Sequence, residues 1–247
     1  MAVIAGNWKM HHGPTEALNF FSEFEAGALP STHELIVFPP IASLHAVATS
    51  EQRDSRVQIG VQNVHWEDSG AFTGEISAHM AKDAGATFAL VGHSERRHVF
   101  GETVIQTNLK VDVLIRAGLV PVLCVGETIQ ERQAGLVEEV ILRQLDGALA
   151  SLRSAPRFLV AYEPVWAIGT GETATSADAT SAHGTLRRRL EHAMGMVQAA
   201  QIPILYGGSV KPENAADLMD APGVDGVLVG GASLDATSFG EIVVAAG

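Results

Sequence analysis

A carboxylate stands where a buried strand is expected to end. The segment AYEPVWAIGTG, residues 161–171, follows the apolar run FLV, so Glu163 closes that run and a proline comes directly after it. A carboxylate in this position is a candidate general base, and exclusion of water makes it a stronger base by raising its pKa. We therefore predict that Glu163 accepts a proton in a reaction.

The residues after Glu163 have the composition of a lid. Pro164 stiffens the start of this segment, residues 165–168 are apolar, and Gly169 and Gly171 give freedom at its far end. Closure of such a lid removes water from Glu163, and we expect it to bring the backbone N–H of Gly169 onto a bound phosphate. The alternative is a surface loop whose tryptophan packs permanently against a neighbour.

Two further apolar runs end in residues of catalytic types. Lys9 follows the first run, and His93 and Glu95 lie in the motif GHSERR after the fourth. If Ser94 or a neighbour begins a helix, the partial positive charge of the helix N-terminus biases His93 toward the neutral, hydrogen-bond-donating form. Lys9 supplies the cation, held by a carboxylate such as Glu95. The alternatives are a packing histidine and a purely structural ion pair.

Glycine pairs follow the last two apolar runs, in YGGSV and LVGGAS. Glycine lets backbone N–H groups approach an oxyanion closely, so Ser209, Gly230 and Gly231 are candidate phosphate ligands. The alternative is a pair of tight turns that need glycine. A base, a neutral donor and a cation around a phosphorylated compound suit removal of a proton next to a carbonyl group, through an enediolate.

Other reaction classes lack their motifs. The sequence has no HExxH, no paired cysteines, no GxGxxG, no P-loop and no GxSxG, so we expect no metal, no cofactor and no serine hydrolase. The single cysteine, Cys124, is expected to pack inside a strand. A formal charge of −12 disfavours nucleic acid and anionic membranes as partners. Without a signal peptide or a membrane-span-length apolar run, the chain is expected to be cytoplasmic.

Eight short apolar runs are expected to position these residues. They begin at Val3, Glu34, Arg56, Thr87, Leu119, Arg157, Ile202 and Asp225. Their nearly continuous apolarity is typical of parallel strands covered on both faces, and segments of helical period, such as residues 15–26 and 137–148, lie between them. Eight such units in about 250 residues favour a single α/β domain over residues 1–247, a (β/α)₈ barrel, over an open doubly wound sheet. The strand ends of a barrel share one face.

Six motifs, in order along essentially the whole chain, resemble the triosephosphate isomerase family: GNWKM, GHSERR, CVGE, AYEPVWAIGTG, YGGSV and LVGGASL. The resemblance implies a cofactor-independent isomerase that interconverts dihydroxyacetone phosphate and D-glyceraldehyde 3-phosphate in glycolysis and gluconeogenesis. It implies that Glu163 is the proton acceptor and His93 the electrophile. The full catalytic set is then Glu163, His93, Lys9, Asn7 and Glu95, and the substrate-binding set is Asn7, Lys9, Gly169, Ser209, Gly230 and Gly231.

The resemblance also implies a partner. The family is typically homodimeric, and QNVHWEDSGAFTGEIS, from Gln62 to Ser77, resembles its interdigitating loop. Thr73 is then expected to reach Asn7 and Lys9 of the partner subunit. From the residues alone, this segment can equally fold on itself.

The chain departs from the family pattern in two places. His11 and His12 stand where the family commonly has Asn, and Glu172 follows GTG where Lys is frequent. Glu172 lies at the C-terminal hinge of the lid, so the resemblance does not carry over to the rate at which the lid opens or to its salt sensitivity. The open alternatives are a barrel that only binds sugar phosphates and a phosphate-binding epimerase or aldolase, which normally needs metal ligands or a Schiff-base lysine.

Overall fold

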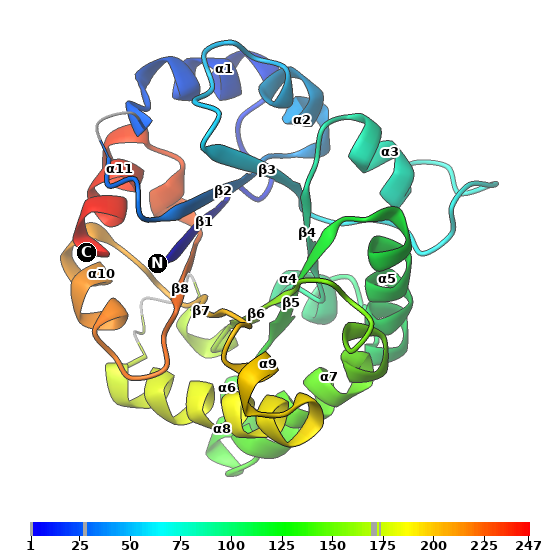
Figure 1. Cartoon of the computed structure of the whole chain (residues 1–247), viewed down its shortest axis with the longest axis vertical. Helices are drawn as coiled ribbons and strands as arrows, with labels where there is room; N and C mark the ends of the chain where they lie inside the picture. Colours follow the sequence, from blue (N-terminus) through cyan, green and yellow to red (C-terminus); the bar gives the residue numbers. More distant parts are fainter. Residues whose placement is uncertain (1, 27–28, 169–171, 173) are drawn as a thin grey trace.

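Eight parallel strands close into a barrel in sequence order (Figure 1). The structure is a computed structural model and describes residues 2–26, 29–168, 172 and 174–247. The strands are β1 Val3–Asn7, β2 Glu34–Phe38, β3 Val57–Val61, β4 Phe88–Val91, β5 Val120–Val125, β6 Leu159–Tyr162, β7 Ile204–Tyr206 and β8 Gly226–Val229. Each lies within one of the eight predicted runs, so the predicted (β/α)₈ barrel is confirmed.

The helices surround the strands on the outside of the barrel (Figure 1). They are α1 Pro14–Glu23, α2 Ile41–Ala48, α3 Ala78–Asp83, α4 Ser94–His98, α5 Val104–Ala117, α6 Ile129–Gln133, α7 Val137–Leu152, α8 Ser176–Met194, α9 Met196–Ala199, α10 Pro212–Met219 and α11 Ala236–Ala245. Two 3₁₀ turns, η2 Val165–Ala167 and η3 Gly231–Ser233, follow β6 and β8. No helix in the described part of the chain is both long and apolar enough to span a bilayer.

The apolar residues form two layers, one on each side of the strands. In β1, Val3 and Ala5 belong to the cluster inside the barrel, while Ile4 packs in the larger cluster between strands and helices. This double coverage explains why the strands read as continuous apolar runs. Cys124 is fully buried in the inner cluster, as expected for a packing residue.

The helix predicted over residues 15–26 is present, but it ends before the predicted range does. Its apolar stripe, Ala17, Phe20 and Phe21, is buried as predicted, but α1 ends at Glu23. Phe24 adopts extended backbone angles and still buries its ring against Phe20. The apolar pattern of the helix therefore extends to Phe24, one residue beyond the end of the helix, because the side chain of Phe24 is buried as well.

Candidate active site

Glu163 follows β6 and is almost fully buried, with 2% of its surface exposed. Its backbone N–H donates to the carbonyl of Val125 over 2.7 Å, which fixes it to the end of β5. Gly126 makes this approach possible, because a Cβ atom there would lie 1.7 Å from the Glu163 carbonyl oxygen. The carboxylate accepts a hydrogen bond from the Ser94 N–H over 2.8 Å. Strand pairing therefore aims the acid at the end of β4.

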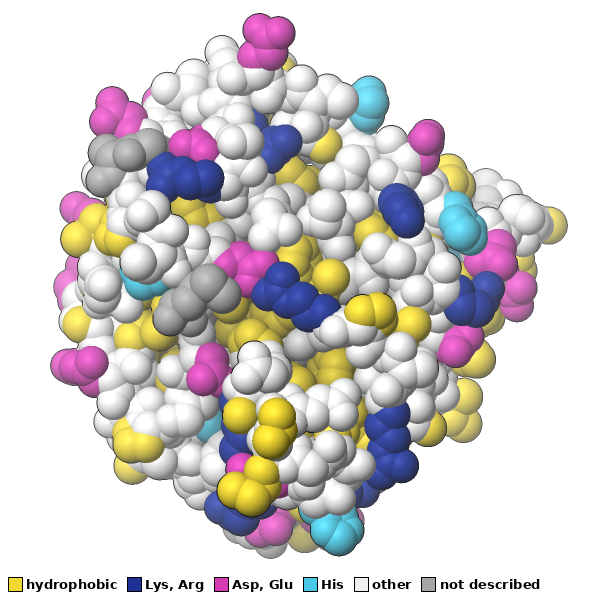
Figure 2. Space-filling model, in the orientation of Figure 1, with side chains coloured by type: hydrophobic (Ala, Val, Ile, Leu, Met, Phe, Trp, Pro, Cys, Tyr) yellow, Lys and Arg dark blue, Asp and Glu magenta, His cyan; other side chains and the backbone are white. Residues whose placement is uncertain are grey.

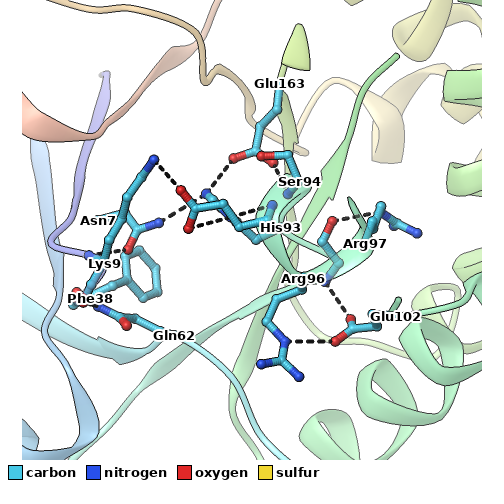
Figure 3. A network of polar contacts seen from close by, with 12 residues as sticks. Asn7, Lys9, Phe38, Gln62, His93, Ser94, Arg96, Arg97, Glu102 and Glu163 are labelled. Carbon is cyan, nitrogen blue, oxygen red and sulfur yellow. Dashed lines mark hydrogen bonds and ion pairs between the residues drawn. The ribbon is translucent and has the colours of Figure 1, made fainter. Parts of the chain in front are cut away.

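His93 lies between β4 and α4 and faces Glu163 (Figure 3). As the N-cap of α4, its Nδ1 accepts the backbone N–H of Glu95 over 3.3 Å. Its Nε2 lies 3.0 Å from Glu163 Oε1 and 3.1 Å from Asn7 Nδ2. The helix N-terminus thus directs Nε2 toward the two other polar groups at the centre of the site.

The two groups shift each other's pKa. Burial, the largest influence on His93, disfavours the imidazolium, but attraction and hydrogen bonding to Glu163 together with attraction to Glu95 outweigh it and raise the pKa of His93. Burial likewise favours protonated Glu163, but the contacts with His93 and the Ser94 N–H lower the pKa of this acid. The neighbouring carboxylates therefore oppose the bias toward neutral His93 that a helix N-terminus gives, while Nδ1, which accepts the Glu95 N–H, carries no proton in this arrangement.

Lys9 lies opposite this pair, and its ion pair with Glu95 is present. The distance from Nζ to Glu95 Oε1 is 2.6 Å, with both side chains partly exposed. The Lys9 backbone is in the left-handed region, with φ of 51°, and its N–H donates to Asn7 Oδ1 over 3.0 Å. Gln62 holds the same residue from the other side by donating to the Lys9 carbonyl over 2.8 Å. Residues of β1, α4 and the loop after β3 thus position the ammonium group (Figure 3).

A single cavity of about 560 Å³ joins these residues to the glycine turns. Its lining includes Asn7, Lys9, His93 and Glu163 at one end and Gly207, Gly208, Ser209, Gly230 and Gly231 at the other. Glu95 lines a separate hollow of about 230 Å³ on the other side of Lys9. Gly169 lies outside the described residues. Among the residues that are described, no group of three or more His, Cys, Asp or Glu side chains is arranged to hold a metal ion.

The first part of the predicted lid is anchored to the barrel. Trp166, in η2, donates its indole N–H to Glu127 Oε1 over 2.8 Å, and the Arg132 guanidinium lies 4.4 Å from the indole ring centroid. Ser209 donates its hydroxyl to the Ala167 carbonyl over 2.7 Å. In this arrangement the Ser209 hydroxyl therefore serves the lid segment, whereas the sequence predicts that it binds phosphate.

Sequence reasoning missed two buried carboxylates that support the site. Glu127 is fully buried and accepts hydrogen bonds from Tyr162 as well as Trp166. Glu102 bonds to the Lys110 ammonium and accepts the N–H of Gly92, the residue before His93, over 3.1 Å. Glu127 carried the same signal as Glu163, an acid directly after an apolar run. Glu102 lies in the loop between α4 and α5, where no strand is expected to end, and has no such signal.

A family profile and individual relatives of known name both assign the chain to the same family. The family profile for triosephosphate isomerase matches residues 2–246. The chain is 47% identical to the triosephosphate isomerase of Synechococcus sp. (strain JA-3-3Ab), an alignment that covers 98% of this chain and 93% of the relative. It is also 47% identical to that of Moorella thermoacetica, covering 98% and 97%, and 46% identical to that of Symbiobacterium thermophilum, covering 99% and 96%. The chain therefore belongs to the triosephosphate isomerase family.

Proposed function

We propose that this chain interconverts dihydroxyacetone phosphate and D-glyceraldehyde 3-phosphate by moving a proton between adjacent carbons, with Glu163 as the base. The observation that supports this most strongly is the single cavity, which has an acid, an imidazole and an ammonium at one end and glycine turns at the other. Membership of the family makes the chain an isomerase. The whole of residues 1–247 would serve this reaction as one domain, in the cytoplasm, where glycolysis supplies triose phosphates.

The reaction begins with transfer of a C1 proton of dihydroxyacetone phosphate to Glu163. The electron pair left on carbon forms the enediolate, whose developing negative oxygen is stabilised by His93 and Lys9. The proton of the C1 hydroxyl passes to the C2 oxygen by way of His93, and Glu163 returns its own proton to C2, which gives the aldehyde. No atom is gained or lost, so the reaction needs no cofactor.

Substrate binding changes the base itself. The pKa of Glu163 is low because His93 and the Ser94 N–H contact its carboxylate, while burial alone favours the protonated acid. When His93 turns its Nε2 to a substrate oxygen, Glu163 loses its attractive partner and stays buried. The pKa of Glu163 then rises, so the substrate produces the stronger base that the reaction requires.

The glycine turns would hold the phosphate at the other end of the cavity. Backbone N–H groups of Ser209, Gly230 and Gly231, joined by Gly169 from the lid, supply local positive potential in a chain whose net charge is −12. The lid then excludes water from the enediolate, which otherwise eliminates phosphate. Glu95 would act by holding the Lys9 ammonium.

We also propose that the active form is a homodimer through residues 62–77. This segment projects from the barrel between β3 and α3 (Figure 1), and apolar as well as charged side chains lie on it (Figure 2). Phe72 in this segment is 41% exposed. Met10, which is 93% exposed, and Phe100, which is 67% exposed, line the hollow beside Lys9 that Thr73 of the partner subunit would fill.

An assay of isomerisation separates an enzyme from a barrel that only binds sugar phosphates. Glyceraldehyde 3-phosphate formed from dihydroxyacetone phosphate can be oxidised by an added NAD-dependent dehydrogenase and followed by absorbance. We expect turnover without added metal or cofactor. Binding of dihydroxyacetone phosphate in calorimetry without any turnover would refute the proposed function and favour the binding protein.

A further inference from the structure

We propose that His12 is a positioning residue that fixes the phosphate-binding turn against the segment that carries Lys9. The proposal rests on the proposed function of the cavity and adds a residue to it. His12 contacts neither Glu163 nor the cavity, and it departs from the family pattern. Its ring nitrogen nevertheless contacts Leu234, which directly follows the turn η3, and its ring packs against Trp8, which directly precedes Lys9.

Two side chains of the segment after β1 form hydrogen bonds with the turn η3 and the residue that follows it. His12 Nε2 lies 2.8 Å from the Leu234 carbonyl, and Trp8 donates its indole N–H to the Ser233 carbonyl over 2.9 Å. These two carbonyl groups belong to the end of η3 and its C-cap. The imidazole N–H and the indole N–H therefore satisfy adjacent carbonyl groups that the short turn leaves without a helical partner.

Ser233 and Leu234 also close the turn that carries Gly230 and Gly231. The Ser233 N–H donates to the Gly230 carbonyl over 2.9 Å, and the Leu234 N–H donates to the Gly231 carbonyl over 3.1 Å. A displacement of Ser233 or Leu234 thus moves Gly230 and Gly231 as well. His12 is joined to the phosphate-binding N–H groups through one residue and two hydrogen bonds.

His12 is itself held in place, which an anchor requires. Its backbone is in the left-handed region, with φ of 64°, and its carbonyl accepts the hydroxyl of the fully buried Ser43 over 2.6 Å. Its ring meets the Trp8 ring edge-on, with 4.9 Å between centroids. The orientation of Nε2 toward Leu234 is thereby fixed from both the backbone and the ring.

Lys9 lies between the two anchors along the chain and near the turn. Its Cε would be 3.7 Å from a Cβ atom at Gly230, so the lysine side chain lies beside the first glycine. The spacing between the ammonium group and the phosphate-binding N–H groups therefore depends on how residues 8–12 sit against η3. Loss of the hydrogen bond between His12 and Leu234 therefore lets the glycine turn move relative to Lys9.

The substitution His12→Asn tests this with little backbone strain, because Asn adopts the left-handed region more readily than most residues. The Asn side chain is too short to keep both the ring contact and the bond to Leu234. We expect KM for glyceraldehyde 3-phosphate, and the inhibition constant of inorganic phosphate, to rise roughly 3- to 10-fold, the effect of losing one hydrogen bond. For unphosphorylated glyceraldehyde, kcat/KM should stay within about 2-fold of wild type, because this substrate does not use the turn.

His11→Asn is the matched control, since His11 is exposed, lies next to His12 and has no left-handed backbone. The control should leave all three constants unchanged. Equal losses for the phosphorylated and unphosphorylated substrates, no change in KM, or the same effect in both variants would overturn the proposal. If the wild type shows no turnover, the proposed function fails by itself, and calorimetry with inorganic phosphate still tests whether His12→Asn weakens binding more than His11→Asn.

Discussion

Glu163 and His93, the proposed base and electrophile, lie directly against each other. Glu163 Oε1 lies 3.0 Å from His93 Nε2, and both groups are buried. Burial favours the neutral form of each group, while their contact favours the charged form of each. The reactivity of Glu163 is therefore a property of the pair, and it changes when a ligand competes for His93.

Removal of the imidazole should shift the pH dependence of the remaining activity. In His93→Asn, burial loses the main contact that opposes it, so the pKa of Glu163 rises and the acid limb of kcat/KM moves to higher pH. The control is His98→Asn, at an exposed position of the same helix. Acid limbs at the same pH in the two variants would show that His93 does not lower the pKa of Glu163.

The strands could be predicted from the sequence because they are buried on both faces. The polar contacts that support the site could not be predicted in this way. Strands such as β2 and β6 are covered on both faces, so apolar run length alone located them. The positions after those strands then gave Glu163 and the glycine turns. The pairing of Glu102 with Lys110 joins a loop to α5 and follows no helical or strand period, so only the folded chain reveals it.

Lys110→Met should destabilise the protein because it leaves a buried carboxylate without its main partner. The Glu102 and Lys110 side chains are 3% and 4% exposed. Burial disfavours ionised Glu102, but the contacts with Lys110 and, to a smaller extent, Arg96 together outweigh burial and lower the pKa of Glu102. The contribution of ionised Glu102 to stability is present above its ordinary pKa of 4.5 and is lost as pH falls through the lowered value. We expect the free energy of unfolding at neutral pH to fall by about 3–5 kcal/mol in urea titrations.

Lys82→Met is the control for this change, because Lys82 is an exposed lysine on α3. Its loss should cost less than about 1 kcal/mol, the range of surface substitutions. If Lys110→Met is no more destabilising than Lys82→Met, the buried ion pair does not support the fold near His93.

The barrel of a single subunit leaves one side of the site open. Gln62, at the start of the projecting segment, bonds to the Lys9 carbonyl, so that segment and the site share a residue within one subunit. The hollow of about 230 Å³ beside Lys9 and the exposed Met10 lie on the same side. A second subunit that fills this hollow would hold Lys9 from the side opposite the substrate cavity.

Phe72→Asp should therefore convert the proposed homodimer to monomers and lower activity. A charge at this exposed position of the projecting segment opposes its burial in a partner, and a loosened Lys9 should lower kcat/KM by roughly one to two orders of magnitude. Sedimentation and activity can be measured on the same samples. Val197→Asp is the control, since Val197 is 84% exposed on α9, away from this segment in Figure 1. Fully active monomers of Phe72→Asp would contradict the link between assembly and the site.

Incorporation of solvent deuterium measures directly whether Glu163 carries the proton between carbons. Dihydroxyacetone phosphate is incubated with the protein in D₂O and followed by NMR for carbon-bound deuterium in substrate and product. We expect rapid incorporation with the wild type and a loss of roughly 100- to 10,000-fold with Glu163→Gln, the range for removal of a general base. Incorporation by Glu163→Gln at the wild-type rate would contradict this role of Glu163.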